Sequence, residues 1–338
     1  SGPVITASAN NKVYTATTAA TGSLAIANLF PGDSVAVGYS NATFASPNVA
    51  NGITVTFNGV TLSGASAANY AVGAVPVTAT ANITPAPLTV SLGLSASNKV
   101  YDTTNSASIA VTGTQTLSGV LGTDTVSVAS SGPYTGTFAQ TNVGNAITVT
   151  PNTSTTTING VGYTTMAGLT LTGAQAGNYY VTGPSGTLSA NITPAPLTIS
   201  GGLSASNKVY DATTAASITA GTQTLSGVLS SDLGHVSVAS SGPYTGTFSQ
   251  ANVGSSLTVT PATTSTTING ASYTTLAGAS LTGSAAANYY VAGVSAPLTA
   301  NITPYVINFG ASSGPAIVAT ANDKVYTSTT AANGALSL

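Results

Sequence analysis

The sequence of 338 residues contains no cysteine, arginine, glutamate or tryptophan, and charged residues make up only 3% of it. The absence of cysteine excludes disulfide bonds and thiolate metal sites. A net charge of −2 gives no electrostatic reason to bind nucleic acid or an acidic membrane surface. Proline, glycine, asparagine and threonine interrupt every apolar run, so the sequence predicts no membrane-spanning segment.

The scarcity of charge is informative in its own right, because a soluble monomer normally keeps about a quarter or more of its surface charged. Apolar residues make up 42% of the chain, which is enough to form a core and argues against disorder. We therefore expect a folded chain that packs against copies of itself or lies within an extracellular matrix.

What the sequence does contain is internal repetition, which decides the fold assignment. The motif ANITPAPLT occupies 81–89 and 190–198, and the variant ANITPYVIN occupies 300–308. Ser1 and the residues after it correspond to Ser313 and its successors, an offset of 312 residues. The chain therefore reads as a window from a longer array.

We predict three repeat modules, of which the first is a short form, followed by the start of a further module. They are repeat one (residues 1–86), repeat two (87–195), repeat three (196–304) and a truncated segment at 305–338 that repeats residues 1–26.

Within the repeats, alternating apolar and polar residues predict half-buried strands, as at 52–62 and 124–130. In repeats two and three, an Asn-Gly pair between threonine-rich arms (155–165 and 265–275) predicts a hairpin with a two-residue turn, which repeat one lacks. The stretches that end in Asn-Tyr, such as 173–179, predict no more than one helical turn.

The predicted class is therefore all-β, with seven or more strands in each repeat. We expect a tandem array of Ig-like β-sandwich modules, with β-grasp-like modules as the alternative. Short proline-containing extended linkers at ITPAPLT would join them, since proline removes a backbone donor and disfavours a central strand position.

The order of the motifs carries a family resemblance. N-K-V-Y-D-x-T-T is followed by L-S-G-V, by an Asp and V-S-V, by N-V-G, by L-T-G-x-x-x-x-N-Y and by I-T-P. This order resembles the YDG repeat domain, which recurs in tandem in filamentous-haemagglutinin-like adhesins of Gram-negative bacteria. The chain departs from that pattern at the glycine after Tyr-Asp, where Thr103 and Ala212 stand instead. The resemblance implies a secreted, repetitive fibre attached to the bacterial surface.

Neither catalysis nor metal binding is indicated. His235 is the only histidine and occurs in repeat three alone, which is typical of a solvated loop residue. Six aspartates spread over the chain form no calcium-binding loop. We expect no enzymatic activity, no metal and no cofactor.

All four lysines lie in one recurring tetrapeptide, Asn or Asp followed by Lys-Val-Tyr. Each complete repeat also carries one recurring aspartate, and a buried charge without a partner is costly. The sequence thus predicts structural Lys–Asp pairs, unless both groups are solvated surface charges: Lys12 with Asp33, Lys99 with Asp124, and Lys208 with Asp232. Alternation along a strand argues against Asp102 as the partner of Lys99.

A covalent version of the same hypothesis adds an asparagine near the end of each repeat. Lysine, an acid and asparagine follow one another in the order found in surface domains with intramolecular Lys–Asn isopeptide bonds. The candidate acceptors are Asn82, Asn191 and Asn301.

The tyrosines of the NKVY and NYY motifs predict core or junction packing, since a tyrosine ring is apolar and its hydroxyl seeks a partner. Tyr163 and Tyr273, on the predicted hairpins, are the candidates for contacts outside the chain, for example with a glycan.

The function favoured by the sequence is a structural segment of a long secreted bacterial cell-surface or extracellular-matrix fibre that self-associates and gives reach and stiffness. The alternative is an adhesin module that recognises a glycan or protein through loops or the added hairpins.

Overall fold

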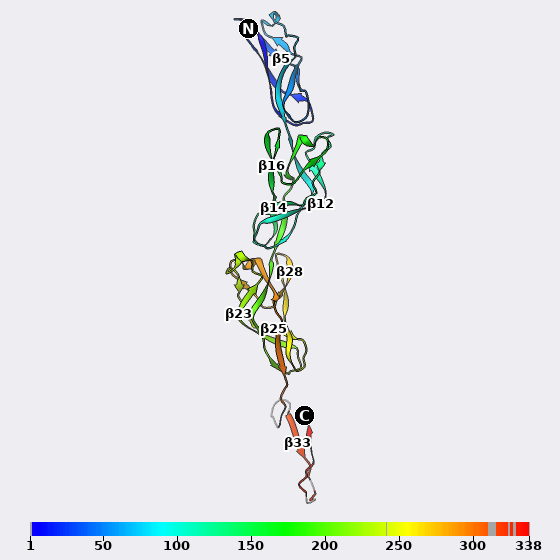
Figure 1. The fold of residues 1–338 in the computed structure, drawn as a ribbon, viewed down its shortest axis with the longest axis vertical. Helices are drawn as coiled ribbons and strands as arrows, with labels where there is room; N and C mark the ends of the chain where they lie inside the picture. The colour runs from blue at the N-terminus through cyan, green and yellow to red at the C-terminus, as the bar shows by residue number, and fades with distance from the viewer. Residues whose placement is uncertain (1, 241, 310–315, 324, 327–328, 338) are drawn as a thin grey trace. The chain divides into compact units, whose positions relative to one another are not determined.

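The computed structural model is built from strands and single turns of 3₁₀ helix (Figure 1). It describes residues 2–240, 242–309, 316–323, 325–326 and 329–337. Lys324, the fourth recurring lysine, lies outside the described residues. The predicted all-β class is confirmed, and the finer Ig-like or β-grasp-like assignment stays a prediction. No helix in the described ranges is long and apolar enough to span a membrane.

The chain divides into two compact units. The first comprises residues 1–100 and 104–193, and the second comprises 101–103 and 194–338. The strands of each main sheet come from one repeat of the sequence, except that two of them begin at Ala86 and Ala195, the last residues of the preceding repeats. The predicted domain boundaries stay a prediction.

Repeat one contributes a five-stranded sheet in the order β2-β9-β7-β6-β3. Its strands are β2 (Lys12–Val13), β9 (Val77–Thr84), β7 (Ala50–Asn58), β6 (Asn41–Phe44) and β3 (Ala19–Ala20). Two strand pairs accompany it: β1 (Val4–Ala9) with β4 (Gly22–Ala27), and β5 (Ala36–Gly38) with β8 (Thr61–Ser63).

Repeat two forms a seven-stranded mixed sheet in the order β11-β20-β15-β14-β12-β10-β19. The strands are β11 (Lys99–Val100), β20 (Leu188–Thr193), β15 (Gly144–Pro151), β14 (Tyr134–Phe138), β12 (Ser106–Ser118), β10 (Ala86–Ala96) and β19 (Tyr179–Pro184). The β10–β19 and β11–β20 pairs are parallel, and the other pairs of this sheet are antiparallel.

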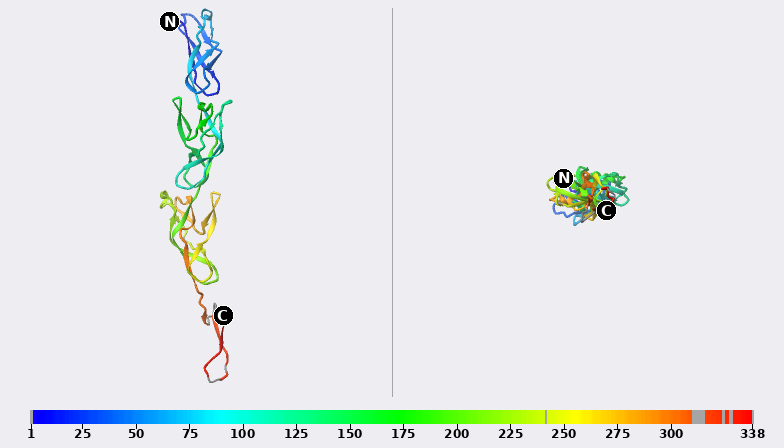
Figure 2. Two further views of the ribbon diagram at one scale, coloured as in Figure 1. Left: turned by 45° about the vertical axis from the view of Figure 1, so that its right-hand side comes forward. Right: turned by 90° about the horizontal axis from the view of Figure 1, so that it is seen from below.

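Repeat three repeats this topology in the order β22-β31-β26-β25-β23-β21-β30. The strands are β22 (Lys208–Val209), β31 (Leu298–Thr303), β26 (Gly254–Pro261), β25 (Tyr244–Phe248), β23 (Ala215–Ser226), β21 (Ala195–Ala205) and β30 (Tyr289–Val294). The tail forms a small sheet of its own, red in Figures 1 and 2, from β32 (Asn308–Phe309), β33 (Ala316–Ala321) and β34 (Gly334–Ser337).

The predicted hairpins are confirmed. β16 (Thr153–Ile158) pairs with β17 (Val161–Met166), and β27 (Thr263–Ile268) pairs with β28 (Ala271–Leu276). Between the first pair, Asn159 and Gly160 have φ values of 50° and 80°, as a two-residue turn with both central residues at positive φ requires.

The stretches that end in Asn-Tyr form single 3₁₀ turns, as predicted: η1 (Ala67–Asn69), η2 (Ala176–Asn178) and η4 (Ala286–Asn288). A further turn is η3 (Ser230–Asp232). Two short strand pairs complete the units: β13 (Ser127–Val128) with β18 (Leu171–Thr172), and β24 (Ser237–Val238) with β29 (Leu281–Thr282).

The expectation for the ITPAPLT segment needs a correction. Only Pro85 separates β9 from β10, and β10 lies between β12 and β19 rather than in a linker. Pro87 is tolerated there because β12 joins β10 only from Thr89 onward, so at Pro87 the strand is paired on one side, with β19. The segment is therefore the first strand of the next sheet.

The consequence is a core that continues across the boundary between repeats one and two. Leu88 and Val90 of β10 are buried in one cluster with residues of repeat one such as Val55 and Ile83. Alternate residues of β10 face this cluster, which is why its sequence reads APLTV with small or apolar residues at every second position.

Candidate functional site

The strand-end lysines are held by the loops that follow them. The Lys208 Nζ donates to Asp211 Oδ1 at 2.7 Å and to the Thr213 carbonyl at 2.7 Å, and it lies 5.5 Å from the centroid of the Phe248 ring. Strand β22 is only two residues long, so the chain turns back and brings Asp211 to the lysine on its own strand.

The other two described lysines follow the same pattern. The Lys12 Nζ donates to Thr15 Oγ1 at 3.1 Å and to the carbonyls of Thr17 and Ala19 at 2.6 and 2.9 Å. The Lys99 Nζ donates to the Thr104 carbonyl at 2.8 Å. Each lysine therefore fixes its own loop, and in repeat one Thr15 takes the place that Asp211 has in repeat three.

The recurring aspartates bind tyrosines instead. Asp124 Oδ2 accepts hydrogen bonds from the hydroxyls of Tyr14 at 2.8 Å and Tyr179 at 2.7 Å. Asp232 Oδ2 accepts them from Tyr101 at 2.8 Å and Tyr289 at 2.7 Å. Both tyrosines of each set are buried.

Ring geometry and backbone contacts complete each of these Tyr–Asp–Tyr junctions. The rings of Tyr14 and Tyr179 meet edge to face, with centroids 5.3 Å apart at 80°, which is a favourable arrangement of aromatic quadrupoles. Tyr101 and Tyr289 do the same at 5.4 Å and 82°. The hydroxyl of Tyr179 also accepts the backbone N–H of Leu121 at 3.0 Å.

A buried asparagine adds a second contact in the first unit. The Val49 N–H donates to Asn178 Oδ1 at 2.9 Å, and the Asn178 amide donates to Asn48 Oδ1 at 3.1 Å. Asn178 lies in repeat two and Val49 in repeat one. The junction thus joins two repeats through a tyrosine hydroxyl and a backbone amide.

The predicted Lys–Asp pairs are corrected by these contacts. Asp33 accepts the hydroxyl of Tyr70, Asp124 and Asp232 accept pairs of tyrosines, and the lysines bind loop oxygens. The strand-alternation argument, made for Lys99 and Asp102, does not hold at the equivalent position of repeat three. There Lys208 pairs with Asp211, because strand β22 ends at Val209.

The asparagines proposed as isopeptide acceptors have a different role. The Oδ1 atoms of Asn82, Asn191 and Asn301 accept the backbone N–H groups of Gly52, Ala146 and Ser256 at 2.8, 2.8 and 2.7 Å. These three donors have φ values of 64°, 49° and 49° and lie where the strand register shifts. The asparagines therefore secure β-bulges.

The lysine and the asparagine also face opposite sides of the sheet. Lys12 is the register partner of Ile83 in the parallel β2–β9 pair, and Ile83 is buried. Asn82 precedes Ile83, so its side chain projects to the other face. This geometry argues against a Lys12–Asn82 isopeptide bond.

Tyr163 and Tyr273 pack within their own repeats. Their rings lie 4.9 Å from those of Tyr180 and Tyr290, so each hairpin is held against a strand of the main sheet. Both remain partly exposed, and their contacts outside the chain stay a prediction.

His235 is exposed, with its Nδ1 3.3 Å from the hydroxyl of Ser284. Among the residues that the structure describes, no group of three or more His, Cys, Asp or Glu is placed to hold a metal ion.

The turn after each Lys-Val-Tyr places one residue at a positive φ, which explains why the family motif has a glycine at that position. Ala16, Thr103 and Ala212 occupy that position with φ values of 59°, 68° and 62°. Positive φ is strained for a residue with a Cβ, and most for a β-branched one.

We therefore expect Thr103→Gly to raise the free energy of unfolding of the second unit by about 1 kcal/mol, since the relief of strain exceeds the entropy gained by the unfolded chain. Chemical denaturation monitored by circular dichroism measures this. Thr222→Gly, in strand β23 of the same unit and without a positive φ, is the matched control and should destabilise. An equal loss of unfolding free energy in both variants would contradict the inference that Thr103 is strained.

Burial, followed by the hydrogen bond to Asp124, raises the pKa of Tyr179 to about 12, and burial and Asp232 raise the pKa of Tyr289 to about 12. A raised tyrosine pKa stabilises the fold below the ordinary value of 10, and this contribution disappears as the pH rises through 12.

We expect the junctions to persist to about pH 10 and to open between pH 10 and 12. Ultraviolet absorbance of tyrosinate, followed together with circular dichroism, measures the coupling of ionisation to unfolding. Titration of all fifteen tyrosines at the ordinary pKa, without loss of structure, would contradict it.

The sequence indicated the tyrosines of NKVY and NYY as core or junction residues. The structure confirms this for Tyr14, Tyr101, Tyr179 and Tyr289, whereas Tyr326 is 90% exposed. The sequence analysis missed Asp124, Asp232 and Asn178 as their partners. The available signal was recurrence: each complete repeat carries one such aspartate and one Asn-Tyr pair.

The family model of the YDG domain matches residues 3–80, 84–164 and 193–296. No curated protein and no solved structure matches the chain.

Proposed function

Because the chain belongs to the YDG domain family, we propose that it is a structural segment of a long secreted fibre, located at a bacterial cell surface or in an extracellular matrix. Its role is to give reach and stiffness and to associate with copies of itself. It performs no catalysis in this role.

The observation that carries this proposal is the repeated Tyr–Asp–Tyr junction. The Tyr14–Asp124–Tyr179 contacts fix one repeat to the next through buried groups rather than through a flexible linker. Only one residue, Pro85, lies between the last strand of repeat one and the first strand of repeat two. A chain that gives reach and stiffness needs such restrained connections, whereas a flexible tether would use an exposed glycine-serine linker.

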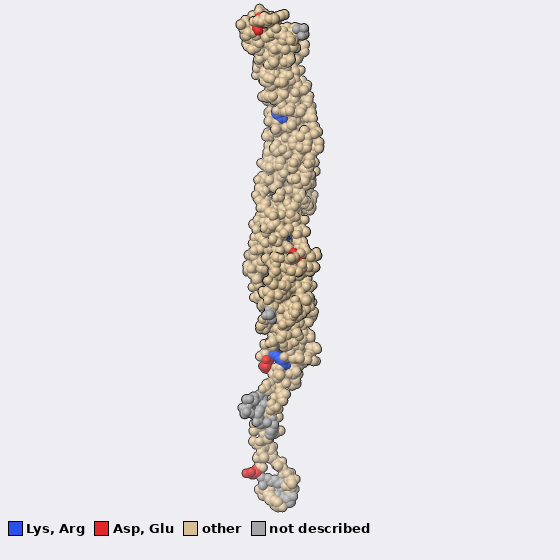
Figure 3. Space-filling view, turned by 90° about the vertical axis from the view of Figure 1, so that its left-hand side faces the viewer, with Lys and Arg blue, Asp and Glu red and all other residues tan. Residues whose placement is uncertain are grey.

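The surface supports association between copies. On the face shown in Figure 3, charged atoms occupy only a few small spots. With charged residues at 3% of the chain, little electrostatic repulsion opposes contact between two such surfaces.

A second candidate function, recognition of a glycan, is favoured by one recurring feature. A cavity of about 330 Å³ lies beside the hairpin of repeat two, lined by Thr156, Leu169 and Tyr180, and repeat three has a similar one of about 280 Å³ lined by Tyr290. Partly exposed tyrosine rings offer stacking surfaces for sugars.

Immunogold electron microscopy of the producing cells, with antibodies against residues 1–338, tests the fibre proposal. We expect label along extracellular filaments or in matrix material. Label restricted to the cell interior would overturn it, whether or not the purified chain associates.

A further inference from the structure

We propose that the outer edge of the hairpin strand β16 pairs with the same edge of a second copy of this chain, as two antiparallel strands centred on Thr155. The equivalent strand β27 of repeat three carries the same kind of edge, centred on Ser265. This inference rests on the proposed function and deepens it, because it names the contact through which copies associate.

The backbone groups along one side of β16 are left unpaired in the residues that the structure describes, where β16 pairs with β17 alone. The Asn152 carbonyl accepts the N–H of Ala167, in register with the hairpin, so the even-numbered residues of β16 bond to β17. The N–H and C=O groups of the odd-numbered residues therefore point away from β17. These residues are Thr153, Thr155 and Thr157.

The same geometry recurs in repeat three. In the described part of that repeat, β27 pairs with β28 alone, and the Ala262 carbonyl accepts the N–H of Ala277. The outward groups of β27 therefore belong to Thr263, Ser265 and Thr267. Because the open edge recurs with both hairpins, it is a property of the longer repeat and not of a single loop.

Neither edge has the features that normally keep an exposed strand from pairing, which are short length, lysine, proline and bulges. β16 and β27 are six residues long, contain no lysine, proline or glycine, and pair within their hairpins without a register shift. Their residues are exposed apart from the last, Ile158 and Ile268, which are partly exposed. Most of these residues are β-branched, which favours extended backbone.

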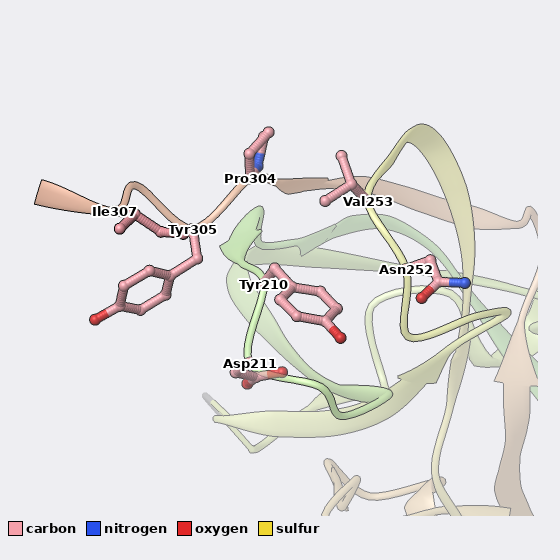
Figure 4. Close-up of a pocket in the computed structure, with 7 residues that line it drawn as sticks. All are labelled: Tyr210, Asp211, Asn252, Val253, Pro304, Tyr305 and Ile307. Carbon is pink, nitrogen blue, oxygen red and sulfur yellow. The ribbon is translucent and has the colours of Figure 1, made fainter. Parts of the chain in front are cut away.

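The edges of the main sheet are protected, by contrast. β22, at one edge of the sheet in repeat three, is two residues long and begins with Lys208. Asp211, which Figure 4 shows next to Tyr210, follows this strand and pairs with Lys208. At the other edge of the sheet, β30 packs against β28 of the hairpin. The edge of the hairpin has neither the charge nor the short length that protects β22.

The hairpin is held in place before any partner binds. The Tyr163 ring lies 4.9 Å from the Tyr180 ring of the main sheet, and the Asn51 side-chain amide donates to the Asn159 carbonyl at the tip of the hairpin at 2.8 Å. Figure 1 shows β16 at the side of its repeat. Because the strand is already fixed, little conformational entropy is lost when a second strand pairs with it.

The sequence of β16 complements itself in an antiparallel pair. In the proposed register, Thr155 lies opposite the Thr155 of the second copy. Thr153 then lies opposite Thr157, and each of these odd-numbered pairs exchanges two backbone hydrogen bonds. The remaining pair is Ser154 with Thr156. Every opposed pair is therefore Thr–Thr or Ser–Thr, and such hydroxyl pairs stabilise antiparallel strands.

This self-complementarity identifies the occupant of the edge as a second copy of the chain, because like residues meet at every position. Charged residues make up 3% of the chain and none lies in β16, so little electrostatic repulsion opposes the contact. Two identical edges related by a twofold axis form a closed contact between two copies. Since β27 offers a second such edge, association continues beyond the dimer.

Single-cysteine variants test the register, because the parent chain contains no cysteine. The Cα atoms of a hydrogen-bonded antiparallel pair are about 5.5 Å apart, within reach of a disulfide. We expect Thr155→Cys to form covalent dimers at neutral pH with oxidised glutathione as the oxidant. An equimolar mixture of Thr153→Cys and Thr157→Cys should also form them, whereas neither of these variants should do so alone.

Thr164→Cys is the matched control. Thr164 is exposed and is the register partner of Thr155, so it lies on the same face of the hairpin but on the inner strand β17. This variant should form no covalent dimer. Equal yields from Thr155→Cys and Thr164→Cys, or no dimer from Thr155→Cys, would overturn the inference.

Charge substitutions test whether the same edge drives association of the intact chain. Thr155→Lys combined with Ser265→Lys places like charges opposite each other in both contacts. In sedimentation velocity, this should raise the apparent dissociation constant at least about tenfold. The corresponding double aspartate variant should behave likewise, and an equimolar mixture of the two should associate at least as strongly as the parent. Thr164→Lys with Thr274→Lys, on the inner strands, is the control and should associate as the parent does.

Monomers at every concentration of the parent, or unchanged association of both charged variants, would overturn the inference. The second outcome would leave self-association through another surface intact. The immunogold experiment tests the fibre proposal separately, since label confined to the cell interior overturns the proposed function whatever the cross-links show.

Discussion

Replacing Asp124 with alanine is expected to lower the free energy of unfolding of the first unit by about 3 kcal/mol. The carboxylate accepts two hydrogen bonds from buried tyrosines, and hydrogen bonds to a charged group contribute about 1.5–3 kcal/mol each. Alanine leaves the hydroxyl of Tyr14 without this acceptor in a buried position, where no water replaces it readily.

Asparagine at the same position provides a graded comparison. Its amide oxygen accepts both hydroxyls but carries no charge, and neutral hydrogen bonds are about half as strong as charge-assisted ones. We expect Asp124→Asn to lose about half as much free energy as the alanine variant.

Hydrogen exchange with mass spectrometry is the suitable measurement, because the chain has two units and a single global transition is not assured. Peptides from β19 and around Val49 should exchange faster in Asp124→Ala, while those from repeat three should not change. Asp323→Ala removes the same charge from an exposed site and serves as the control. Equal protection in both variants would contradict a structural role for the junction.

The sequence predicted the strands and hairpins well because those signals are local. Alternation at 52–62 and the Asn-Gly pair at 159–160 act through neighbouring residues. The structure follows them in the β16–β17 hairpin and in β7 and β8, which Gly59 and Val60 separate, whereas the run 124–130 forms a strand only at Ser127–Val128. The junction could not be read in this way, since Tyr14 and Asp124 are separated by 110 residues and belong to different repeats. Recurrence indicated that the aspartate matters but not which group it binds.

The lysine partner was missed for a different physical reason. Side chains alternate between the two faces of a sheet only within a continuous strand, and β22 ends at Val209. The positive φ of Ala212 then reverses the chain, so that Asp211 meets Lys208 from the same side. A Tyr-Asp-Gly motif in the family pattern was the available indication of a turn at this point.

In the ITPAPLT segment, the proline content predicted a linker, but a strand forms because Pro87 pairs with a neighbouring strand on one side only. Two prolines in seven residues indicated a linker, yet Pro87 needs no donor toward β12 because that pairing starts at Thr89. The same segment supplies Leu88 to a core shared with repeat one. The rule that proline is disfavoured in a central strand therefore did not apply at Pro87, because that end of β10 has only one neighbouring strand, β19.

That shared core leads to the second large effect. Leu88 is 1% exposed and lies in a cluster with residues of repeat one and with Tyr179. Truncation of a buried leucine to alanine removes transfer free energy and leaves a cavity, at a cost of about 2–5 kcal/mol. Because residues of two repeats line the position, we expect Leu88→Ala to loosen both of them.

Leu92, on the same strand, is the matched control. It is 67% exposed, so Leu92→Ala removes the same atoms at a cost of less than about 0.5 kcal/mol. Hydrogen exchange should show that Leu88→Ala weakens protection in β7 and β9 of repeat one as well as in β10 and β19 of repeat two. If protection falls only in repeat two, the two repeats unfold independently and the core between them is not shared. Loss in both, with Leu92→Ala unchanged, would establish that the strand after Pro85 couples one repeat to the next.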